Sequence, residues 1–183
     1  TRIAHGHALY VSREIGDSAT LEANAVQIET SGSGAMGALA RLSGARIHLQ
    51  DSSVVTRGPD AKGLAAMGVN ARLSARNVSV ITSGARAEGL FLSDGADVLL
   101  DNTRLDVMGS GAPGIRSMDN APGARNNLVL KNGSRITTRD GAALRIAGGN
   151  HVLTLENATV TASAGGQENT GILLHSSALP VID

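Results

Sequence analysis

The sequence contains no cysteine and no tryptophan, and it has only one tyrosine, one phenylalanine and four prolines among 183 residues. Without cysteine, neither a disulfide nor a thiolate site can form. With Tyr10 and Phe91 as its aromatic side chains, the chain lacks the stacking surfaces that bind single-stranded nucleic acid. Charge of one sign is not in excess either, because sixteen basic residues balance sixteen acidic ones. We therefore expect no nucleic-acid partner.

Long apolar runs are also missing from the sequence. No stretch approaches the roughly 18 apolar residues of a transmembrane helix. The first residues, TRIAHGH, do not have the charged and then apolar pattern of a signal peptide. Because the chain starts at Thr1 and stops at Asp183 in the sequence ALPVID, we expect a mature product or a fragment of a longer protein.

Glycine is abundant, with 23 residues, and it recurs in phase. Hexamers with glycine at both ends begin at residues 32, 58, 84 and 109, spaced by 26, 26 and 25 residues, and another begins at residue 166. GSGAMG and GSGAPG match the G-x-G-x-x-G pattern of dinucleotide-binding turns, but no helical pattern follows them and the other copies lack the middle glycine. We interpret the outer glycines as structural turn residues, which adopt positive φ or let the backbone close against the core: Gly32, Gly37, Gly58, Gly63, Gly84, Gly89, Gly109, Gly114, Gly166 and Gly171.

Other features share this period. Short runs such as VVT and VIT precede the hexamers, and aliphatic residues follow their second glycine, with alternation at period two and no sustained helical period. An Asx residue stands before each run. We predict that these residues form a ladder through their side chains: Asp51, Asn77, Asn102, Asn132 and Asn157.

Units of about 25 residues with three short strands can bury their apolar side only by stacking on one another. The sequence therefore predicts an all-β fold, a parallel β-helix of about seven coils that forms a single segment over residues 1–183. Thr30, Thr56 and Thr82 recur at one position, and we expect them to pack within a ladder rather than to form a regular outer array.

One interval of the repeat is longer than the others. The extra residues, near 117–127, are rich in Gly, Pro and Asn, which predicts an insertion loop.

Two groups of residues raise the alternative of an enzyme or a metal site. An acidic cluster could serve polysaccharide cleavage on a β-helix, as in a lyase or hydrolase, but its members lie mainly within one coil and at turns: Asp94, Asp97, Asp101 and Asp106. His5 and His7 offer two metal ligands without a third. We therefore predict no catalytic activity, no metal site and no cofactor.

Two stretches carry a family resemblance: NATVTASAGGQENTGILL, residues 157–174, and SARNVSVITSGARAEGLFLSDGADVLL, residues 74–100. In repeat texture they resemble pertactin-like autotransporter passengers of Gram-negative bacteria. The resemblance implies a right-handed parallel β-helix that is exported unfolded through the outer membrane and is displayed at the cell surface or secreted. The absence of cysteine fits that route. Known members act as adhesins, as serum-resistance factors or in other host interactions.

Two features of that family are missing from this chain. The Arg-Gly-Asp tripeptide of pertactin is not present, so that adhesive mechanism is not carried over. Any attachment to the outer membrane would come from a barrel domain that this chain does not contain.

The expected function is therefore a non-enzymatic surface or secreted passenger module for host interaction, in adhesion, immune evasion or virulence. Its partner would be a host protein or a cell-surface receptor. Met118, Asp119 and Arg125 in the insertion are the candidate partner-binding residues, because loops on rigid scaffolds often carry function. A purely structural stalk is the remaining alternative.

Overall fold

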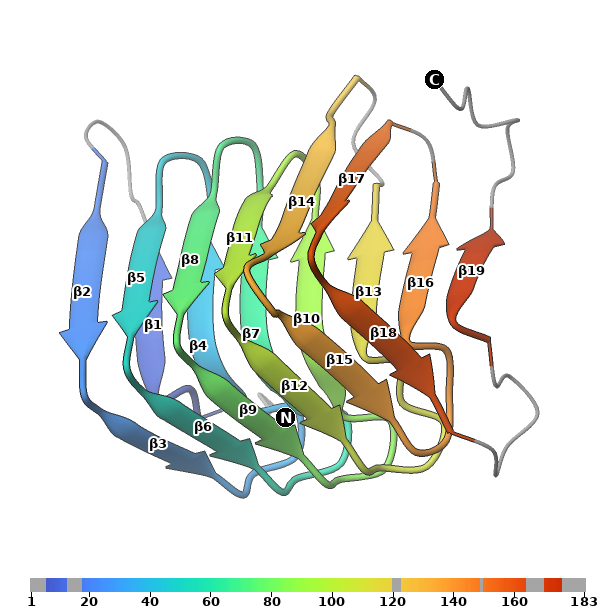
Figure 1. The fold of residues 1–183 in the computed structure, drawn as a ribbon. Coiled ribbons are helices and arrows are strands. Elements are labelled where there is room, and N and C mark those ends of the chain that lie inside the picture. The colour runs from blue at the N-terminus through green and yellow to red at the C-terminus, as the bar shows by residue number, and fades with distance from the viewer. Residues whose placement is uncertain (1–5, 13–17, 120–122, 149, 164–169, 176–183) are drawn as a thin grey trace, which may run out of the picture.

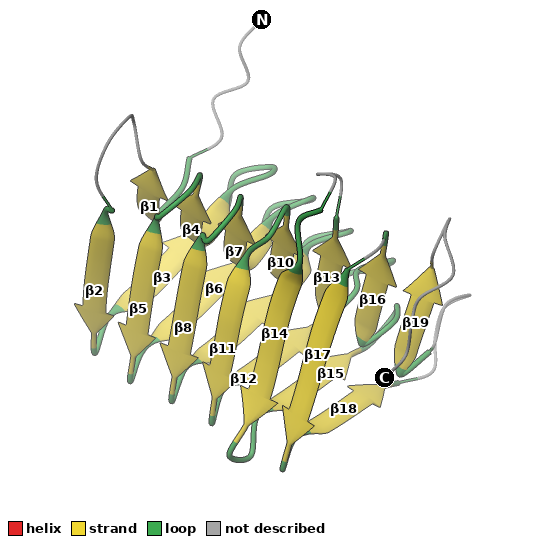
Figure 2. Ribbon diagram, turned by 90° about the horizontal axis from the view of Figure 1, so that it is seen from above, coloured by secondary structure: helices red, strands yellow, loops and turns green. Residues whose placement is uncertain are grey.

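The computed structural model describes residues 6–12, 18–119, 123–148, 150–163 and 170–175. Throughout these residues the fold is a β-solenoid of parallel strands, and its three sheets form the sides of a prism (Figures 1 and 2). Each strand pairs with the equivalent strands of the neighbouring turns. The chain advances as a right-handed coil, the sense that parallel crossover connections favour (Figure 1). The predicted parallel β-helix is confirmed, with about six complete turns and one further strand in the first sheet.

The first sheet, sheet A, has seven strands, and the other two sheets, B and C, have six each. Sheet A contains β1 (Leu9–Ser12), β4 (Met36–Arg41), β7 (Lys62–Met67), β10 (Glu88–Ser93), β13 (Ile115–Met118), β16 (Leu144–Ala147) and β19 (Ile172–His175). Sheet B contains β2 (Thr20–Asn24), β5 (Arg46–Gln50), β8 (Arg72–Arg76), β11 (Asp97–Asp101), β14 (Asn126–Lys131) and β17 (His151–Glu156). Sheet C contains β3 (Gln27–Thr30), β6 (Ser53–Thr56), β9 (Ser79–Thr82), β12 (Arg104–Val107), β15 (Arg135–Thr138) and β18 (Thr159–Ala162).

The core is a set of aliphatic columns that run along the solenoid axis. Because side chains alternate across a strand, every second residue points inward and stacks on its register partners. The sheet A column includes Ala38, Leu64, Leu90, Ile115 and Leu144, all buried. Each fully buried Leu or Ile contributes about 2–3 kcal/mol of hydrophobic free energy. Thus aliphatic stacking replaces the aromatic core of an ordinary domain.

The threonines also follow the predicted register. Thr30 pairs with Thr56, and Thr56 pairs with Thr82, at the inward position of sheet C. Thr56 and Thr82 are fully buried, and the Thr82 hydroxyl donates to the Ala87 carbonyl at 2.9 Å. They pack within the ladder, as expected.

The glycine hexamers lie at the turns between sheets C and A, and their last glycine falls inside the next strand or directly before it. The expectation that the outer glycines adopt positive φ was wrong, because none of the described ones has a left-handed φ. That conformation falls on the third residue of the hexamer instead: Gly34, Asp60, Arg86 and Gly111. Gly166 lies outside the described residues.

Close stacking, the second reason expected, explains most of the outer glycines. A Cβ on Gly37 would lie 2.6 Å from the Gly63 carbonyl oxygen, and one on Gly63 would lie 2.7 Å from that of Gly89. Backbone of the next coil therefore occupies the space of a side chain. At Gly32 and Gly171 a Cβ would have room.

The insertion is shorter than the sequence suggested. Ser117 and Met118 belong to β13, and Asn126 already belongs to β14. The extra residues therefore lie within 119–125, in the turn between sheets A and B, where the preceding coil has only residues 94–96. Both ends continue the register of the solenoid, so the scaffold absorbs the insertion without losing its pairing.

Candidate functional site

The structure places the three predicted partner-binding residues at one corner, between sheets A and B. Met118 ends β13 on the outer face of sheet A, Asp119 follows it, and Arg125 precedes β14. Met118 and Asp119 are half-buried and Arg125 is exposed. The Asp119 N–H donates to the Ala147 carbonyl of the next coil at 3.2 Å. Both ends of the insertion are therefore fixed by the solenoid.

Asn126 braces this corner. It is 1% exposed, and its Oδ1 accepts hydrogen bonds from the N–H groups of Gly95 at 2.8 Å and Ala96 at 3.1 Å. Its Nδ2 donates to the Met118 carbonyl at 2.6 Å. One buried side chain thus joins the start of the insertion, its end and the turn of the preceding coil.

Ser117 and His151 extend the brace. The Ser117 Oγ lies 2.8 Å from His151 Nδ1, and Asn126 Nδ2 lies 3.2 Å from the same hydroxyl. His151 Nε2 lies 3.0 Å from the Ala147 carbonyl. Because a carbonyl can only accept, Nε2 carries a proton and donates, and Nδ1 is the acceptor in the neutral ring. We call Ser117, Asn126 and His151 the corner cluster.

Electrostatics in the corner cluster favour the neutral ring. Burial lowers the pKa of His151 from its ordinary value, while the hydrogen bond to the Ala147 carbonyl and the charge of Asp119 act in the opposite direction more weakly. A neutral imidazole can then accept from Ser117 and Asn126.

Sequence reasoning missed the corner cluster, although a signal was present. Ser117 occupies the inward position that Ala40, Ala66 and Leu92 fill in earlier coils. Asn126 takes the position that an alanine fills at the end of the equivalent turn in earlier coils: Ala45, Ala71 and Ala96. A polar residue at a repeat position that is otherwise apolar marks the place where the repeat is interrupted.

Met118 also touches an apolar cluster on the outer face of sheet A. Leu39, Ala65 and Phe91 lie there in register across three coils and are buried, with methionines packed around them. Most solvated sheet faces are polar, so this surface is unusual for the repeat.

Ionic groups border the same cluster. Glu88 lies 3.2 Å from Arg116 Nη1 and 3.9 Å from Lys62 Nζ, and Lys62 lies 5.4 Å from the centre of the Phe91 ring. Burial raises the pKa of Glu88, and the nearby cations Lys62, Arg116 and Arg145 lower it by less. The outer face of sheet A beside the corner therefore combines apolar and cationic groups.

The predicted Asx ladder lies at the turn between sheets B and C. Asn77 Nδ2 donates to Asp51 Oδ1 at 2.8 Å, and Asn102 Nδ2 donates to Asn77 Oδ1 at 2.9 Å. The Asn77 bond lowers the pKa of Asp51, followed by that of Gln50. All six residues at this turn position have left-handed φ: Ala25, Asp51, Asn77, Asn102, Asn132 and Asn157.

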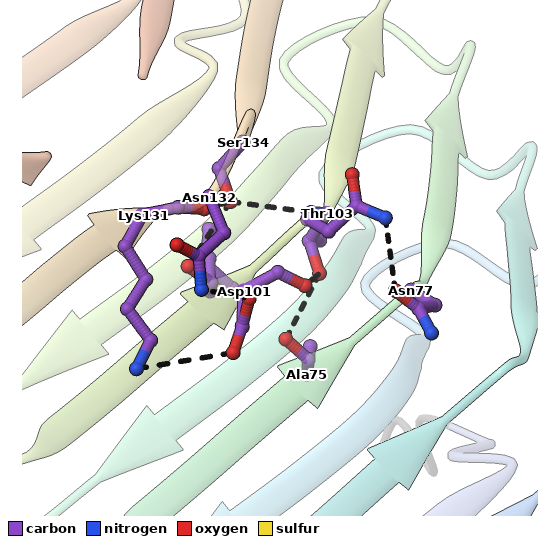
Figure 3. A network of polar contacts seen from close by, with 9 residues as sticks. Ala75, Asn77, Asp101, Thr103, Lys131, Asn132 and Ser134 are labelled. Carbon is purple, nitrogen blue, oxygen red and sulfur yellow. Dashed lines mark hydrogen bonds and ion pairs between the residues drawn. The ribbon is translucent and has the colours of Figure 1, made fainter. Parts of the chain in front are cut away.

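The side-chain ladder is interrupted at Asn132, whose Nδ2 donates to Asp101 Oδ1 at 2.8 Å instead of to Asn102 (Figure 3). Gly133 adds a residue to this turn and has φ of 87°. The added residue displaces Asn132 from the stack. Ser134 links the same two coils instead, because its Oγ accepts from the Thr103 N–H at 3.2 Å (Figure 3).

The structure does not bring the acidic cluster together. Asp97 and Asp101 face outward on sheet B, where Asp97 pairs with Arg72 and Asp101 with Lys131. Asp106 pairs with Arg104 in sheet C, and Asp94 lies in a turn. Three of these carboxylates are held as ion pairs, two on sheet B and one on sheet C, and they do not converge on one site. Within the described ranges, no group of three His, Asp or Glu side chains is placed to hold a metal ion.

A second polar arrangement lies in a shallow groove over the outer face of sheet B. Glu22, His48 and Ser74 occupy the same register position in three successive coils, and His48 Nδ1 lies 2.6 Å from Ser74 Oγ. A Ser–His pair is the start of a nucleophilic site. However, the N–H groups of these strands take part in the parallel ladder and cannot turn toward a substrate oxyanion. This row therefore lacks a backbone oxyanion hole.

Comparisons of the chain with protein-family models, with curated proteins and with solved structures found no match. The described residues contain no long apolar helix of the kind that crosses a bilayer. The fold defines the class of the protein, a parallel β-solenoid with one braced corner. Because a fold does not specify an activity, function has to be argued from the corner itself.

Proposed function

We propose that this chain is a non-enzymatic module of a bacterial autotransporter passenger, displayed at the cell surface or secreted, and that it binds a host protein or receptor. The binding surface would be the corner between sheets A and B, with Met118, Asp119 and Arg125 in contact with the partner. Adhesion, immune evasion and virulence are the roles that such contact would serve.

One observation carries the proposal. The solenoid departs from its repeat at residues 117–126, and there a buried asparagine joins the described ends of the lengthened turn, bonding the Met118 carbonyl and the turn of the preceding coil. Departures from local rules tend to occur at functional sites. Braced ends are also suited to binding, since little conformational entropy is lost when a fixed backbone meets its partner.

The chemistry of the corner suits a macromolecular partner better than a small molecule. Methionine adapts to different apolar surfaces, and Asp119 and Arg125 provide charges of both signs beside it. The adjoining outer face of sheet A adds cationic groups at Lys62 and Arg116.

Binding of the purified chain to cultured host cells tests the proposal. The combined variant Met118→Ala, Asp119→Ser and Arg125→Ser should lose at least about tenfold in affinity, which corresponds to about 1.4 kcal/mol and is less than one hot-spot residue contributes. A matched control changes the same residue types at another corner: Met108→Ala, Asp140→Ser and Arg139→Ser. The control should bind as the parent does. Equal binding of all three proteins would refute the corner as the site, and equal absence of binding would favour the structural stalk.

The enzymatic alternative has a separate test. The chain is incubated with acidic and neutral polysaccharides, with and without calcium, and chain cleavage is measured. Turnover that disappears in Asp101→Asn or Asp106→Asn would replace the binding proposal with catalysis.

A further inference from the structure

We infer that the corner cluster is a pH-dependent anchor, which holds the surface at Met118 and Asp119 while the His151 ring is neutral and loosens it when the ring is protonated. The inference concerns the regulation of the site proposed above. Its effect on partner binding rests on that proposed function, whereas the response of the anchor itself does not.

The hydrogen-bond directions make the anchor sensitive to one proton. His151 Nε2 already donates to the Ala147 carbonyl at 3.0 Å, so an added proton has to go to Nδ1. Nδ1 faces the Ser117 hydroxyl at 2.8 Å and Asn126 Nδ2 at 3.4 Å, and both act as donors toward the neutral ring. Protonation therefore turns Nδ1 from an acceptor into a donor, which then faces two other donors, the Ser117 hydroxyl and Asn126 Nδ2.

The two neighbours differ in their ability to respond. The Ser117 hydroxyl can rotate and accept. The Asn126 amide cannot turn over, because its Oδ1 accepts from Gly95 and Ala96 and its Nδ2 donates to the Met118 carbonyl. A flip would place two pairs of donors against each other. The strain of protonation thus falls on the bonds that fix the start of the insertion.

The groups that face His151 come from three elements and the turn after one of them. β13 contributes Ser117, the turn that follows contributes Asp119, β14 contributes Asn126 and β16 contributes the Ala147 carbonyl. Asp119 carries the charge that acts on His151, and it favours the protonated ring. Burial opposes it and prevails, so the pKa of His151 lies below the ordinary value of about 6.5.

The sign of the effect follows from proton linkage. Between the folded and unfolded pKa values of His151, the unfolded or opened state binds more protons. The contribution of the anchor is complete above pH of about 6.5 and decreases as the pH falls through the folded pKa. Acidification therefore opens the corner, and neutral pH closes it.

Hydrogen exchange of two backbone amides reports on the anchor directly. Gly95 and Ala96 donate to Asn126 Oδ1, so their protection from exchange should fall between pH 7.5 and pH 4.5, after correction for intrinsic exchange. The fall should be about tenfold for each unit by which burial lowers the pKa of His151. Ala71, which donates to Gly68 in the equivalent turn, should keep its protection and serves as the internal control.

Two variants separate the anchor from general acid effects. His151→Gln should remove the pH response of the Gly95 and Ala96 amides. His48→Gln should leave it intact, because that exposed histidine bonds Ser74 on another face. If His151→Gln does not fold, an NMR titration of His151 in the parent protein gives the answer. A pKa at or above 6.5, or amide protection that does not change with pH, would overturn the anchor.

Host-cell binding measured at the same two pH values distinguishes this inference from the proposed function. If amide protection and host-cell binding both decrease at pH 4.5, the anchor and the proposed function are both supported. If amide protection changes with pH but host-cell binding, although present, does not, the anchor is supported and its role in binding is refuted. Binding that is absent at both pH values contradicts the proposed function and leaves the amide result to decide the anchor.

Discussion

The coils from β4 to β12 and the coil from β13 to β15 use the same three strands but connect them differently. In the first region, turns are short, inward positions are apolar or threonine, and the Asx side chains bond from one coil to the next. In the second region, the turn between sheets A and B is lengthened, Ser117 points inward and the Asx ladder is interrupted at Asn132.

The difference shows that strand pairing and turn regularity are separable. Pairing continues through β13, β14 and β15 without a change of register. The columns of aliphatic side chains maintain it, whereas each turn needs only to satisfy its own polar groups. A solenoid of this kind can vary one corner without disturbing its core.

The largest expected effect comes from breaking a column within the regular region. Leu90→Ala removes a side chain that is fully buried, and we expect a loss of about 3 kcal/mol in the free energy of unfolding. Ile172→Ala, at the equivalent position of the last strand in sheet A, should cost about 1 kcal/mol because Ile172 is already 44% exposed. Urea unfolding followed by circular dichroism compares the two. Equal losses would contradict the stacked core.

A smaller effect is expected from adding one methyl group between coils. Gly63→Ala places a Cβ 2.7 Å from the Gly89 carbonyl oxygen and against Val80, and it should cost about 2 kcal/mol. Gly171→Ala has nothing within 4 Å of the new Cβ and should be nearly neutral. The same unfolding measurement applies, and a neutral Gly63→Ala would refute close stacking as the reason for the glycines.

The Asx ladder should contribute less than the core. Asn77→Ala removes a residue that bonds both Asp51 and Asn102 and that tolerates left-handed φ, so we expect a loss of about 1 kcal/mol. Asn132→Ala removes one side-chain bond and should cost less. The midpoints of urea unfolding rank the two variants, and the reverse order would contradict the ladder as a stacked unit.

The smallest effect should be a gain in stability. Leu42 is exposed and has φ of 72°, a conformation in which leucine is strained. Leu42→Asn should stabilise the chain by about 0.5 kcal/mol, because asparagine adopts this conformation more easily. Val69→Asn, an exposed turn position without left-handed φ, is the control and should give no gain. The thermal midpoint of each variant tests this difference.

The sequence was sufficient to predict the solenoid, because the same spacing of glycine, Asx and aliphatic residues recurs in each coil and so indicates one strand register throughout. Thr56 and Thr82 fall at the inward position that their spacing indicated. The reason for the glycines was only half predictable. Whether a glycine is needed for φ or for space depends on what the next coil places beside it, as the Gly89 carbonyl oxygen does beside Gly63.

The corner cluster could not be predicted from spacing. Ser117, Asn126 and His151 come from three different strands, and the repeat aligns them only once the insertion is assigned to residues 119–125. The insertion itself was visible, but its boundaries were too wide because Ser117 and Met118 continue β13. The sequence of a turn does not show which of its polar residues will be buried.

A turn exchange tests most directly whether the interrupted corner is the functional part of the molecule. Residues 119–125 are replaced by Asp-Gly, the pair at residues 94 and 95 that opens the same turn one coil earlier, and binding to host cells is measured. In a matched exchange, residues 42–45 take the sequence of residues 68–71, which places Gly and Asn at the two left-handed positions, Leu42 and Gly44. The account predicts that both proteins fold, that the first loses at least about tenfold in affinity and that the second binds as the parent does. A folded first variant with unchanged binding would contradict the account.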